Sequence, residues 1–471
     1  MTDLIHLNAN EIVSLLKREE ITPFDCLDAL EKRIAEVNKA VNALPTLCFD
    51  RARDHAKALM KKPVAERGPL AGLPIPIKDL NDVAGVRSTQ GSPIFANHIP
   101  KKSDILVENL EAQGGIVYAM SNTPEFGAGA NTFNEVFGRT LNPWNLSRST
   151  AGSSGGAAAA LATGMAWVAH GSDMGGSLRN PASFCGVTGM RPSPGRVANS
   201  VHGKIDGTLS VDGPMARNVE DLALLFDAMV GANPADPLSQ PREHVSYLAE
   251  ARSGAKPKRV AFSRNLGITP VDPEVAEIVE RAALRLAEAG IIVEEAQPDF
   301  SEAHECFQVL RALAFATGLK TLYENHRDKL KPDVIWNVEK GLKLTGAEIA
   351  RAEMQRGVMF ARAGEFFTRY DLILCPATIV APFPVEQRYV SECDGHTFSN
   401  YVEWLAIVYA FTNVASPAIS IPAGFTREHL PVGIQIAAPC RGEGRLLAAA
   451  KLLEDLLGLG AITPIDPRPG S

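Results

Sequence analysis

The amino-acid sequence predicts an α/β fold, and two units of similar pattern carry this prediction. In residues 104–120 and again in residues 275–296, an amphipathic helical pattern stops at glycine and an apolar strand pattern begins. Alternation of helix and strand is typical of a sheet with helices packed on it. A chain of 471 residues with 45% hydrophobic content is long enough to bury a large core around such a sheet.

A helical flank is expected at the N-terminus, within residues 1–65. Polar capping residues or a helix-opening proline precede its first two helical patterns. We expect these helices to pack against the rest of the chain. They are residues 11–20 after Asn8 or Asn10, residues 24–38 after Thr22 and Pro23, and residues 48–62.

A long surface connection is expected in residues 231–241, where Pro, Asp and Asn are concentrated. It lies either inside one fold or at a boundary between two. Farther along, short β-branched runs interrupted by Pro and Gly indicate strands. The elements expected around these segments are a helix in residues 219–230, strands in 258–263, 415–425 and 430–439, and a closing helix in 443–458.

Composition and charge disfavour a nucleic-acid-binding, a secreted and a membrane-spanning protein. The net charge of −7, from 47 basic and 54 acidic residues, disfavours nucleic-acid binding, and no polybasic cluster counters it. The first twenty residues lack the apolar stretch and cleavage site of a secretory signal. The longest apolar region, residues 157–169, is shorter than the about 20 residues of a membrane span. The seven cysteines are scattered without a CxxC pair, so we expect a reduced cytoplasmic protein with no structural zinc and no membrane partner.

Glycine and serine gather in residues 72–80, 149–160 and 171–186. Within the second segment, the stretch AGSSGG at residues 151–156 admits three readings from its local pattern. A flexible linker is disfavoured because the stretch runs directly into an alanine-rich helical pattern. A phosphate loop would need the lysine of G-x-x-x-x-G-K-[ST], which is missing. A hydrolase elbow centred on Ser154 would follow a buried strand, whereas the preceding residues are polar.

Taken together, the three segments resemble the amidase signature family of serine hydrolases. The motifs that carry the resemblance are GLPIPIKD, SNTPEFG, AGSSGG and GSDMGGSLRNPASFCG, followed by YDLILCPAT and NVASPAISIPAGF. The resemblance covers most of the chain and implies a single amidase domain over residues 1–471, built on a mixed central β-sheet covered by helices on both faces. Residues from about 231 to 400 would supply the variable walls of the substrate pocket. Two local departures are Ala151, where the family usually has glycine, and residues 119–122, where GKTN is common.

The resemblance assigns catalytic roles to one lysine and two serines. Ser177 would be the nucleophile, Ser153 a relay after a cis peptide bond from Gly152, and Lys78 the base. A serine hydroxyl needs a proton acceptor to attack a carbonyl, and lysine can serve only when neutral. Burial among the apolar residues around Lys78 would lower its pKa from the usual value of about 10.4. Without the other motifs, each residue also has a structural interpretation. Lys78 could form an ion pair with Asp79, and Ser153 could cap the N-terminus of the following helix.

The run from Met174 to Ser177 would supply the oxyanion hole. Consecutive backbone N–H groups can stabilise the negative oxygen of a tetrahedral intermediate, and glycine leaves room for the substrate carbonyl. Charged neighbours would brace this loop by hydrogen bonds instead of contacting the substrate. The expected oxyanion residues are Met174, Gly175, Gly176 and Ser177, and the supporting residues are Ser154, Asp173 and Arg179.

The resemblance thus implies an amidase that hydrolyses a carbon–nitrogen bond through a Ser acyl-enzyme and requires no metal or organic cofactor. Aromatic pocket candidates favour a small-molecule amide with an apolar or aryl acyl group. The alternative is a glutaminase-type subunit of a tRNA-dependent amidotransferase; a noncatalytic scaffold is disfavoured by the intact lysine and serines. A homodimer stays open. The pocket candidates are Phe126, Asn131, Trp336, Tyr401 and Trp404.

Overall fold

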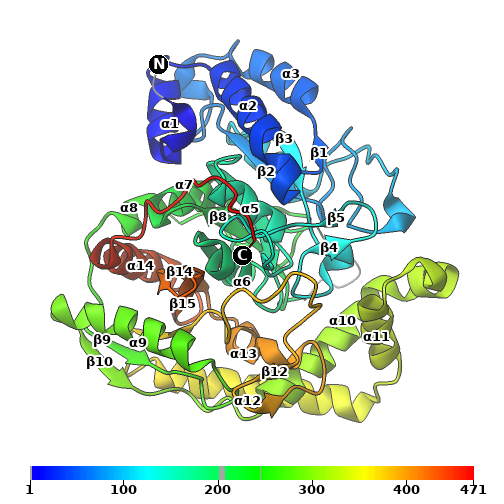
Figure 1. Ribbon diagram of the computed structural model, residues 1–471, viewed down its shortest axis with the longest axis vertical. Coiled ribbons are helices and arrows are strands. Elements are labelled where there is room, and N and C mark those ends of the chain that lie inside the picture. The colour runs from blue at the N-terminus through cyan, green and yellow to red at the C-terminus, as the bar shows by residue number, and fades with distance from the viewer. Residues whose placement is uncertain (1–2, 201–206, 244, 471) are drawn as a thin grey trace.

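A large mixed β-sheet forms the centre of the molecule. The computed structural model describes residues 3–200, 207–243 and 245–470 (Figure 1). Parallel pairing is confined to one edge of this eight-stranded sheet, between β10, β9 and β11, and the remaining neighbours are antiparallel. In spatial order the strands are β10 (Ile292–Glu295), β9 (Arg259–Phe262), β11 (Leu372–Pro376), β15 (Pro431–Ala437), β14 (Ala418–Phe425), β7 (Thr188–Arg191), β8 (Val211–Ala216) and β6 (Val168–Asp173).

Helices cover both faces of this sheet, as the resemblance implied. On β15, Gly433 and Gln435 face α6, because a Cβ on Gly433 would lie 2.8 Å from Ser183 Cβ, and Arg179 donates to Gln435 Oε1. Alternate residues of a strand face opposite sides, so Ile434 and its neighbours face the long helices on the other side. The helices concerned are α6 (Arg179–Cys185), α9 (Pro273–Glu288) and α14 (Glu443–Leu457).

A smaller sheet adjoins the large one. Its strands run in the order β1 (Thr46–Leu47), β3 (Ile116–Ser121) and β2 (Pro74–Lys78). The two prolines of β2 lack an N–H, and they are tolerated because β2 is an edge strand of this sheet. Strand β2 packs against β6, and the backbone N–H of Lys78 donates to His170 Nδ1 at 3.3 Å. This contact brings the lysine motif to the edge of the large sheet.

The N-terminal flank is helical, as predicted. Asn8, one of the two expected caps, accepts a hydrogen bond from Glu11 N in a capping box, and Thr22 caps the second helix in the same way. The short strand β1 falls within the flank and was not expected; two residues are too few to give a sequence signal. The helices are α1 (Ala9–Lys17), α2 (Pro23–Val41) and α3 (Phe49–Leu59).

Both predicted helix-to-strand units are confirmed, as are the C-terminal strands β14 and β15. The first unit is α4 (Ile105–Ala112) with β3, and the second is α9 with β10. Residues 231–243 contain no helix or strand, in agreement with the expected surface connection. The other α-helices of the described residues are α5 (Gly155–Ala162), α7 (Val219–Met229), α8 (Tyr247–Ala251), α10 (Ala303–His326), α11 (Pro332–Leu342), α12 (Gly346–Phe366) and α13 (Ala406–Asn413).

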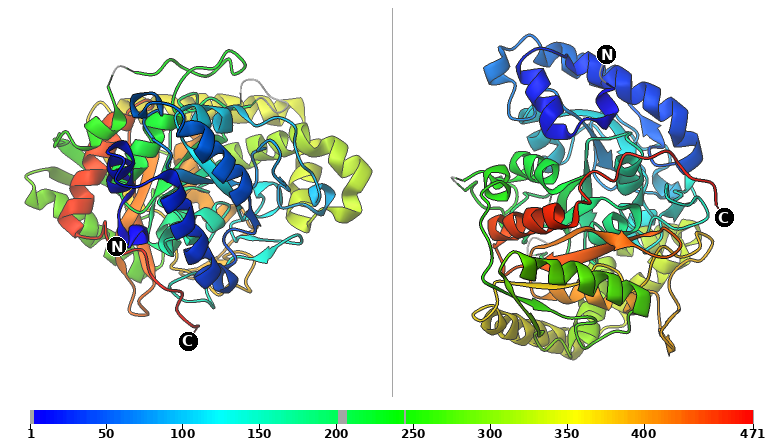
Figure 2. Two further views of the ribbon diagram at one scale, coloured as in Figure 1. Left: turned by 90° about the horizontal axis from the view of Figure 1, so that it is seen from above. Right: turned by 60° about the vertical axis from the view of Figure 1, so that its left-hand side comes forward.

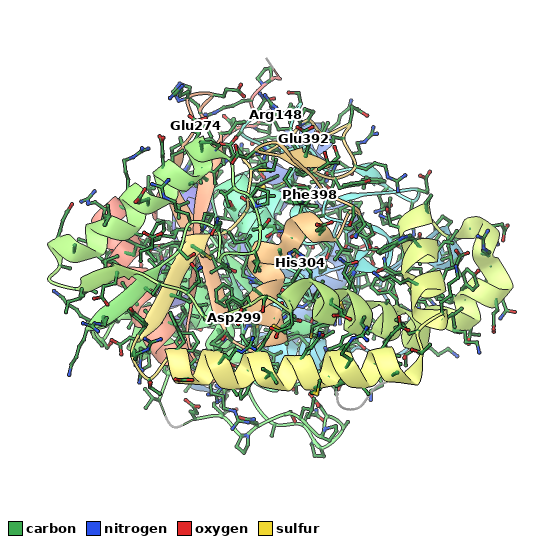
Figure 3. The ribbon with its side chains drawn as sticks, turned by 90° about the horizontal axis from the view of Figure 1, so that it is seen from below. Arg148, Glu274, Asp299, His304, Glu392 and Phe398 are labelled. Atoms are coloured by element: carbon green, nitrogen blue, oxygen red, sulfur yellow. The ribbon has the colours of Figure 1, made fainter. Side chains whose placement is uncertain are left out.

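The helices α10, α11 and α12 were not predicted, and they build the end of the molecule opposite the N-terminal flank (Figures 1 and 2). His304, labelled in Figure 3, ties the start of α10 to α13 through a 2.7 Å hydrogen bond between His304 Nδ1 and Tyr409 Oη. Within the described residues, no helix is long and apolar enough to cross a membrane. The short strands are β4 (Phe133–Asn134), β5 (Gly138–Arg139), β12 (Glu392–Cys393) and β13 (His396–Thr397).

Candidate active site

Lys78 ends strand β2 and its side chain is completely buried. Its Nζ lies 2.7 Å from Ser153 Oγ and 2.9 Å from Ser154 Oγ. Two further oxygens come from Ser172, with Oγ at 3.0 Å and the carbonyl at 3.4 Å. No carboxylate among the described residues forms an ion pair with this amine, and the neighbouring Asp79 bonds instead to Thr89. The surface ion pair that Lys78 alone allowed is therefore absent, and the lysine sits among hydroxyl groups.

Burial lowers the pKa of Lys78 to about 7, although the charges of Asp212 and Asp173 favour its protonated form. Removing an ammonium from water penalises the charged state more than these two carboxylates compensate. A pKa near 7 leaves a large fraction of the amine neutral at physiological pH. Lys78 can thus accept a proton, which is the property that a lysine base requires.

The serine pair lies in a turn that leads directly into α5. The Gly152–Ser153 peptide bond is cis, as the resemblance implied. The helix begins with two glycines, and neighbouring residues leave no space for a side chain at either position. A Cβ on Gly155 would lie 2.3 Å from Thr132 Oγ1, and one on Gly156 would lie 2.3 Å from Asn122 N. Close packing of these glycines holds the turn against the lysine. The linker reading of this stretch is excluded.

Three residues close to Lys78 were not predicted as site residues from the sequence. His170 accepts from the Lys78 backbone through Nδ1, and its Nε2 lies 3.1 Å from Asp212 Oδ1. Ser172, on the same strand β6, supplies the third hydroxyl near Lys78 Nζ. Alternating polar residues along VAHGSD were the available signal, because residues at positions 170 and 172 share one face of a strand.

Asp173 is a buried anion that organises residues 174–177, which are called the oxyanion loop after their predicted role. Its carboxylate accepts from Arg179 Nε at 3.0 Å and from Arg179 Nη2 at 2.9 Å, while Arg191 Nη1 reaches the Asp173 carbonyl at 2.6 Å. Although burial opposes the charge, the two arginines hold the pKa of Asp173 well below its usual range. Two of the three predicted supporting residues, Asp173 and Arg179, therefore brace the loop, and the third, Ser154, contacts Lys78 Nζ instead.

Asp173 also takes one of the four N–H groups assigned to the oxyanion hole. The N–H of Gly176 donates to Asp173 Oδ1 at 3.0 Å, so the prediction for Gly176 as an oxyanion donor is not supported. The described residues contain no acceptor for the N–H groups of Met174, Gly175 and Ser177. Of the four predicted donors, three are therefore without an intramolecular hydrogen bond in the described part of the chain.

Ser177 is partly exposed at the end of this loop, just before α6 begins at Arg179. Its backbone carbonyl accepts from Ser154 N at 3.2 Å, which ties the loop that bears Ser177 to the serine pair. The expected hydrogen bond between the Ser177 and Ser153 hydroxyls is missing among the described contacts. A hydroxyl reorients by rotation about one bond, and catalytic hydrogen bonds often tighten only when substrate is bound.

Gly176 supports a first prediction. Its φ is +96°, and a Cβ would lie 2.5 Å from Val408 Cγ2 and 2.6 Å from Asn180 Oδ1. We expect Gly176→Ala to displace the oxyanion loop and lower kcat/KM by about 10²- to 10³-fold, comparable to losing an oxyanion donor. Steady-state kinetics check this. Gly357→Ala, at an open helical position on α12, is the matched control and should leave kcat/KM within about twofold; equal losses in both variants would contradict the prediction.

The five predicted pocket residues separate into two groups. Asn131 is structural: its Nδ2 donates to the carbonyls of Val385 and Gln387, and its Oδ1 accepts from Ser149. Trp404 is 1% exposed and packs on Phe383 in the main core, although its indole N–H has no acceptor among the described residues. For these two residues the structure does not support the pocket prediction, because their side chains are committed to packing.

Of the other three candidates, Phe126 lies near Met174 and Tyr401 is linked to Met174 through Arg311. Phe126 belongs with Met174 to a small apolar cluster formed by Ala128, Phe315, Leu330, Val334 and Val338. Trp336 on α11 packs edge-on against Tyr401, with ring centroids 5.6 Å apart. A cavity of about 320 Å³ is lined by Met174 together with residues of α10, α12 and 207–211. A larger cavity of about 880 Å³ lies between α1, α7 and α14 and contains none of the predicted site residues.

The site thus combines a buried lysine with three serine hydroxyls at the edge of a mixed sheet. The family model described as Amidase matches residues 25–447. The chain therefore belongs to the amidase signature family, whose members are hydrolases acting on amide bonds.

Similar proteins cover nearly the whole chain. An acylamidase of Rhodococcus erythropolis is 35% identical over 95% of both chains. A glutamyl-tRNA(Gln) amidotransferase subunit of Halothermothrix orenii is 32% identical over 98% of this chain and 99% of the relative. Among solved structures, a bacterial aryl acylamidase of the amidase signature family superimposes with a TM-score of 0.89 at 26% identity, covering 98% of this chain and 99% of the other.

Proposed function

We propose that this amidase hydrolyses small-molecule amides with an apolar or aryl acyl group, through an acyl-enzyme on Ser177. The observation that carries the mechanism is the 2.7 Å contact between the buried Lys78 Nζ and Ser153 Oγ, beside the loop that bears Ser177. Residues 1–471 would act as one domain, with residues from about 231 to 400 supplying the pocket walls.

The first half of the reaction forms the acyl-enzyme. Ser177 Oγ attacks the amide carbon while its proton passes to Ser153 Oγ, and the Ser153 proton passes to the neutral amine of Lys78. The carbonyl oxygen becomes an oxyanion, stabilised by the free N–H groups of Met174, Gly175 and Ser177. Collapse of this intermediate breaks the carbon–nitrogen bond, and the relay returns a proton to the departing amine.

The second half regenerates the enzyme. Water attacks the acyl carbon and gives its proton through Ser153 to Lys78. The ester bond to Ser177 Oγ breaks, the serine recovers a proton and the carboxylic acid leaves. Ser154 and Ser172 hold Lys78 Nζ in place throughout, because both hydroxyls contact it. One buried base thus serves both halves.

The apolar surroundings of the oxyanion loop support the proposed acyl group. Phe126 and Phe315 belong to the small apolar cluster that contacts Met174. An apolar site favours a hydrocarbon or aryl body, since each buried methylene contributes about 0.8 kcal/mol. The similarity to an acylamidase and to an aryl acylamidase points in the same direction.

A glutaminase role is the second candidate, favoured by the 32% identity to an amidotransferase subunit over almost the full chain. A substrate panel separates the two. We expect 4-nitroacetanilide and phenylacetamide to exceed glutamine in kcat/KM by about 100-fold, the discrimination that two well-packed apolar contacts provide. Amine or ammonia release is the readout. Preference for glutamine, or ammonia transfer to glutamyl-tRNA, would replace the proposed function by the second candidate.

A further inference from the structure

We propose that Arg311 and Tyr401 bind a carboxylate carried by the amide substrate, next to the oxyanion loop. This inference rests on the proposed function and narrows its substrate class. It starts from a buried guanidinium on α10 that the mechanism above does not use. The substrate would then be an amide with an apolar or aryl body and one carboxylate group.

One face of α10 runs along the oxyanion loop. Phe307 lies against Gly175, since a Cβ on that glycine would be 3.1 Å from Phe307 Cζ. One turn later, Arg311 Nη1 lies 3.4 Å from Met174 Sδ, and a further turn brings Phe315 into the small apolar cluster. Residues four apart share a helix face. Arg311 is therefore placed at the loop that would hold the reacting carbonyl.

The guanidinium lacks an anionic partner. Arg311 is 7% exposed, and no described carboxylate forms an ion pair with it. Its Nη2 donates to Tyr401 Oη at 3.1 Å, its Nη1 meets only the weak acceptor Met174 Sδ, and its Nε has no acceptor among the described residues. The rings of Phe315 and Tyr401 lie 4.6 and 5.9 Å from the guanidinium carbon, which compensates part of the charge. A buried cation without an anion is costly, so a ligand that supplies the anion gains affinity.

Tyr401 adds a second donor to the same place. Its hydroxyl oxygen accepts from Arg311 Nη2 and from Asn337 Nδ2, so both lone pairs are used and its own hydrogen has no acceptor in the described part of the chain. The Asn337 amide is oriented by the hydrogen bond from Nδ2 to the Asp333 carbonyl at 2.7 Å, which leaves its Oδ1 unpaired within the described structure. Arg311 and Tyr401 thus offer two unsatisfied donors, and Asn337 offers one acceptor.

A carboxylate matches this arrangement better than a neutral carbonyl. Its two oxygens can accept from Arg311 Nε and from the Tyr401 hydroxyl together, and its charge neutralises the guanidinium. The small apolar cluster beside Phe315 would meanwhile hold the hydrocarbon part of the same molecule. The acceptor at Asn337 Oδ1 is left for an N–H of the substrate.

Matched substrate pairs test the proposal on both sides of the scissile bond. The first pair is glutaryl-4-nitroanilide with pentanoyl-4-nitroanilide, and the second is 4-acetamidobenzoate with 4-methylacetanilide, in which a methyl group replaces the carboxylate. The two pairs carry the carboxylate on opposite sides of the scissile bond, so we expect a preference in one of them. In that pair the carboxylate member should have a kcat/KM about 10- to 100-fold higher, mainly through a lower KM, because charge-assisted hydrogen bonds strengthen its binding by this amount. Arg311→Met should abolish that preference, and Tyr401→Phe should reduce it several-fold.

The control is Lys340→Met, which removes an equal charge from the neighbouring α11. Lys340 Nζ lies over the Trp336 ring at 5.1 Å and donates to Gln308, outside the Arg311 group. This variant should keep the carboxylate preference. A wild-type enzyme without preference in either pair overturns the proposal, as does a loss in Arg311→Met that is equal for both members of a pair.

Calorimetric titration of Ser177→Ala with both members of each pair separates this proposal from the proposed function. Tighter binding of the carboxylate member, lost on adding Arg311→Met, supports the anion site even if no amide of the panel is hydrolysed. Equal affinities for both members in an enzyme that does hydrolyse amides overturn the anion site and leave the amidase function standing. Thermal melting of Arg311→Met and Tyr401→Phe confirms that both variants are folded.

Discussion

Ser177→Ala is expected to lower kcat/KM by about 10⁴- to 10⁶-fold, or about 5 to 8 kcal/mol of transition-state stabilisation. Ser177 is the proposed nucleophile, and without its Oγ no acyl-enzyme forms. The melting temperature should barely change, because the side chain is partly exposed and makes no hydrogen bond in the described structure. Amine release and thermal melting measure the two effects.

A fluorophosphonate probe identifies the nucleophile directly. It should label the wild-type protein at Ser177 and leave Ser177→Ala unlabelled. Ser154→Ala is the matched control: it removes a contact at 2.9 Å from Lys78 Nζ but keeps the nucleophile, so we expect a smaller loss of about 10- to 100-fold. Labelling at Ser154, or near-normal turnover of Ser177→Ala, would restore the hydrolase-elbow reading and reject the mechanism.

Local patterns were sufficient for much of the fold. The helix-to-strand units at α4 with β3 and α9 with β10 were predictable because an amphipathic helix, a glycine and an apolar run follow one another without interruption. The central sheet was not predictable in this way. Its order brings β6 and β10 to opposite edges, and pairing between strands so distant in sequence leaves no local signal.

The helix α10 explains why the substrate side of the site was missed. Its apolar and polar residues are spread around the whole circumference, so no face stands out in the sequence. Only the tertiary structure shows that Phe307 and Arg311 meet the oxyanion loop. Sequence reasoning instead selected aromatic and amide residues by type, which included the core residue Trp404 and the structural residue Asn131.

The proposed catalytic residues were predicted from the family resemblance, and the structure shows the surroundings of Lys78. The position of Lys78 after LPIPI predicted burial, and the side chain is completely buried. The donation of the Gly176 N–H to Asp173 could not be foreseen, because glycine conformation is invisible in sequence. The family resemblance therefore located the loop but did not indicate which of its N–H groups remain free.

A large effect of pH on kcat/KM is also expected, because the proposed base is a lysine. Since burial lowers the pKa of Lys78 to about 7 and only the neutral amine accepts a proton, kcat/KM should rise about tenfold per unit below pH 7 and level off above it. Asp79→Asn is the control, because burial also raises the pKa of Asp79 to about 6. The inflection should persist in Asp79→Asn; its disappearance there would assign the titration to Asp79.

Lys78→Met should lower kcat/KM by about 10³- to 10⁵-fold and remove that inflection, since methionine fills similar space without a base. Stability supplies an independent readout. The pKa of Lys78 is about 7 when folded and 10.5 is its ordinary value, so the unfolded chain binds the extra proton between these limits. Stability of the wild type should therefore gain an increment with rising pH over this window that Lys78→Met lacks. Denaturant titrations at pH 7 and pH 10 measure it; identical pH slopes in both proteins would mean that Lys78 is protonated in the folded state and cannot be the base.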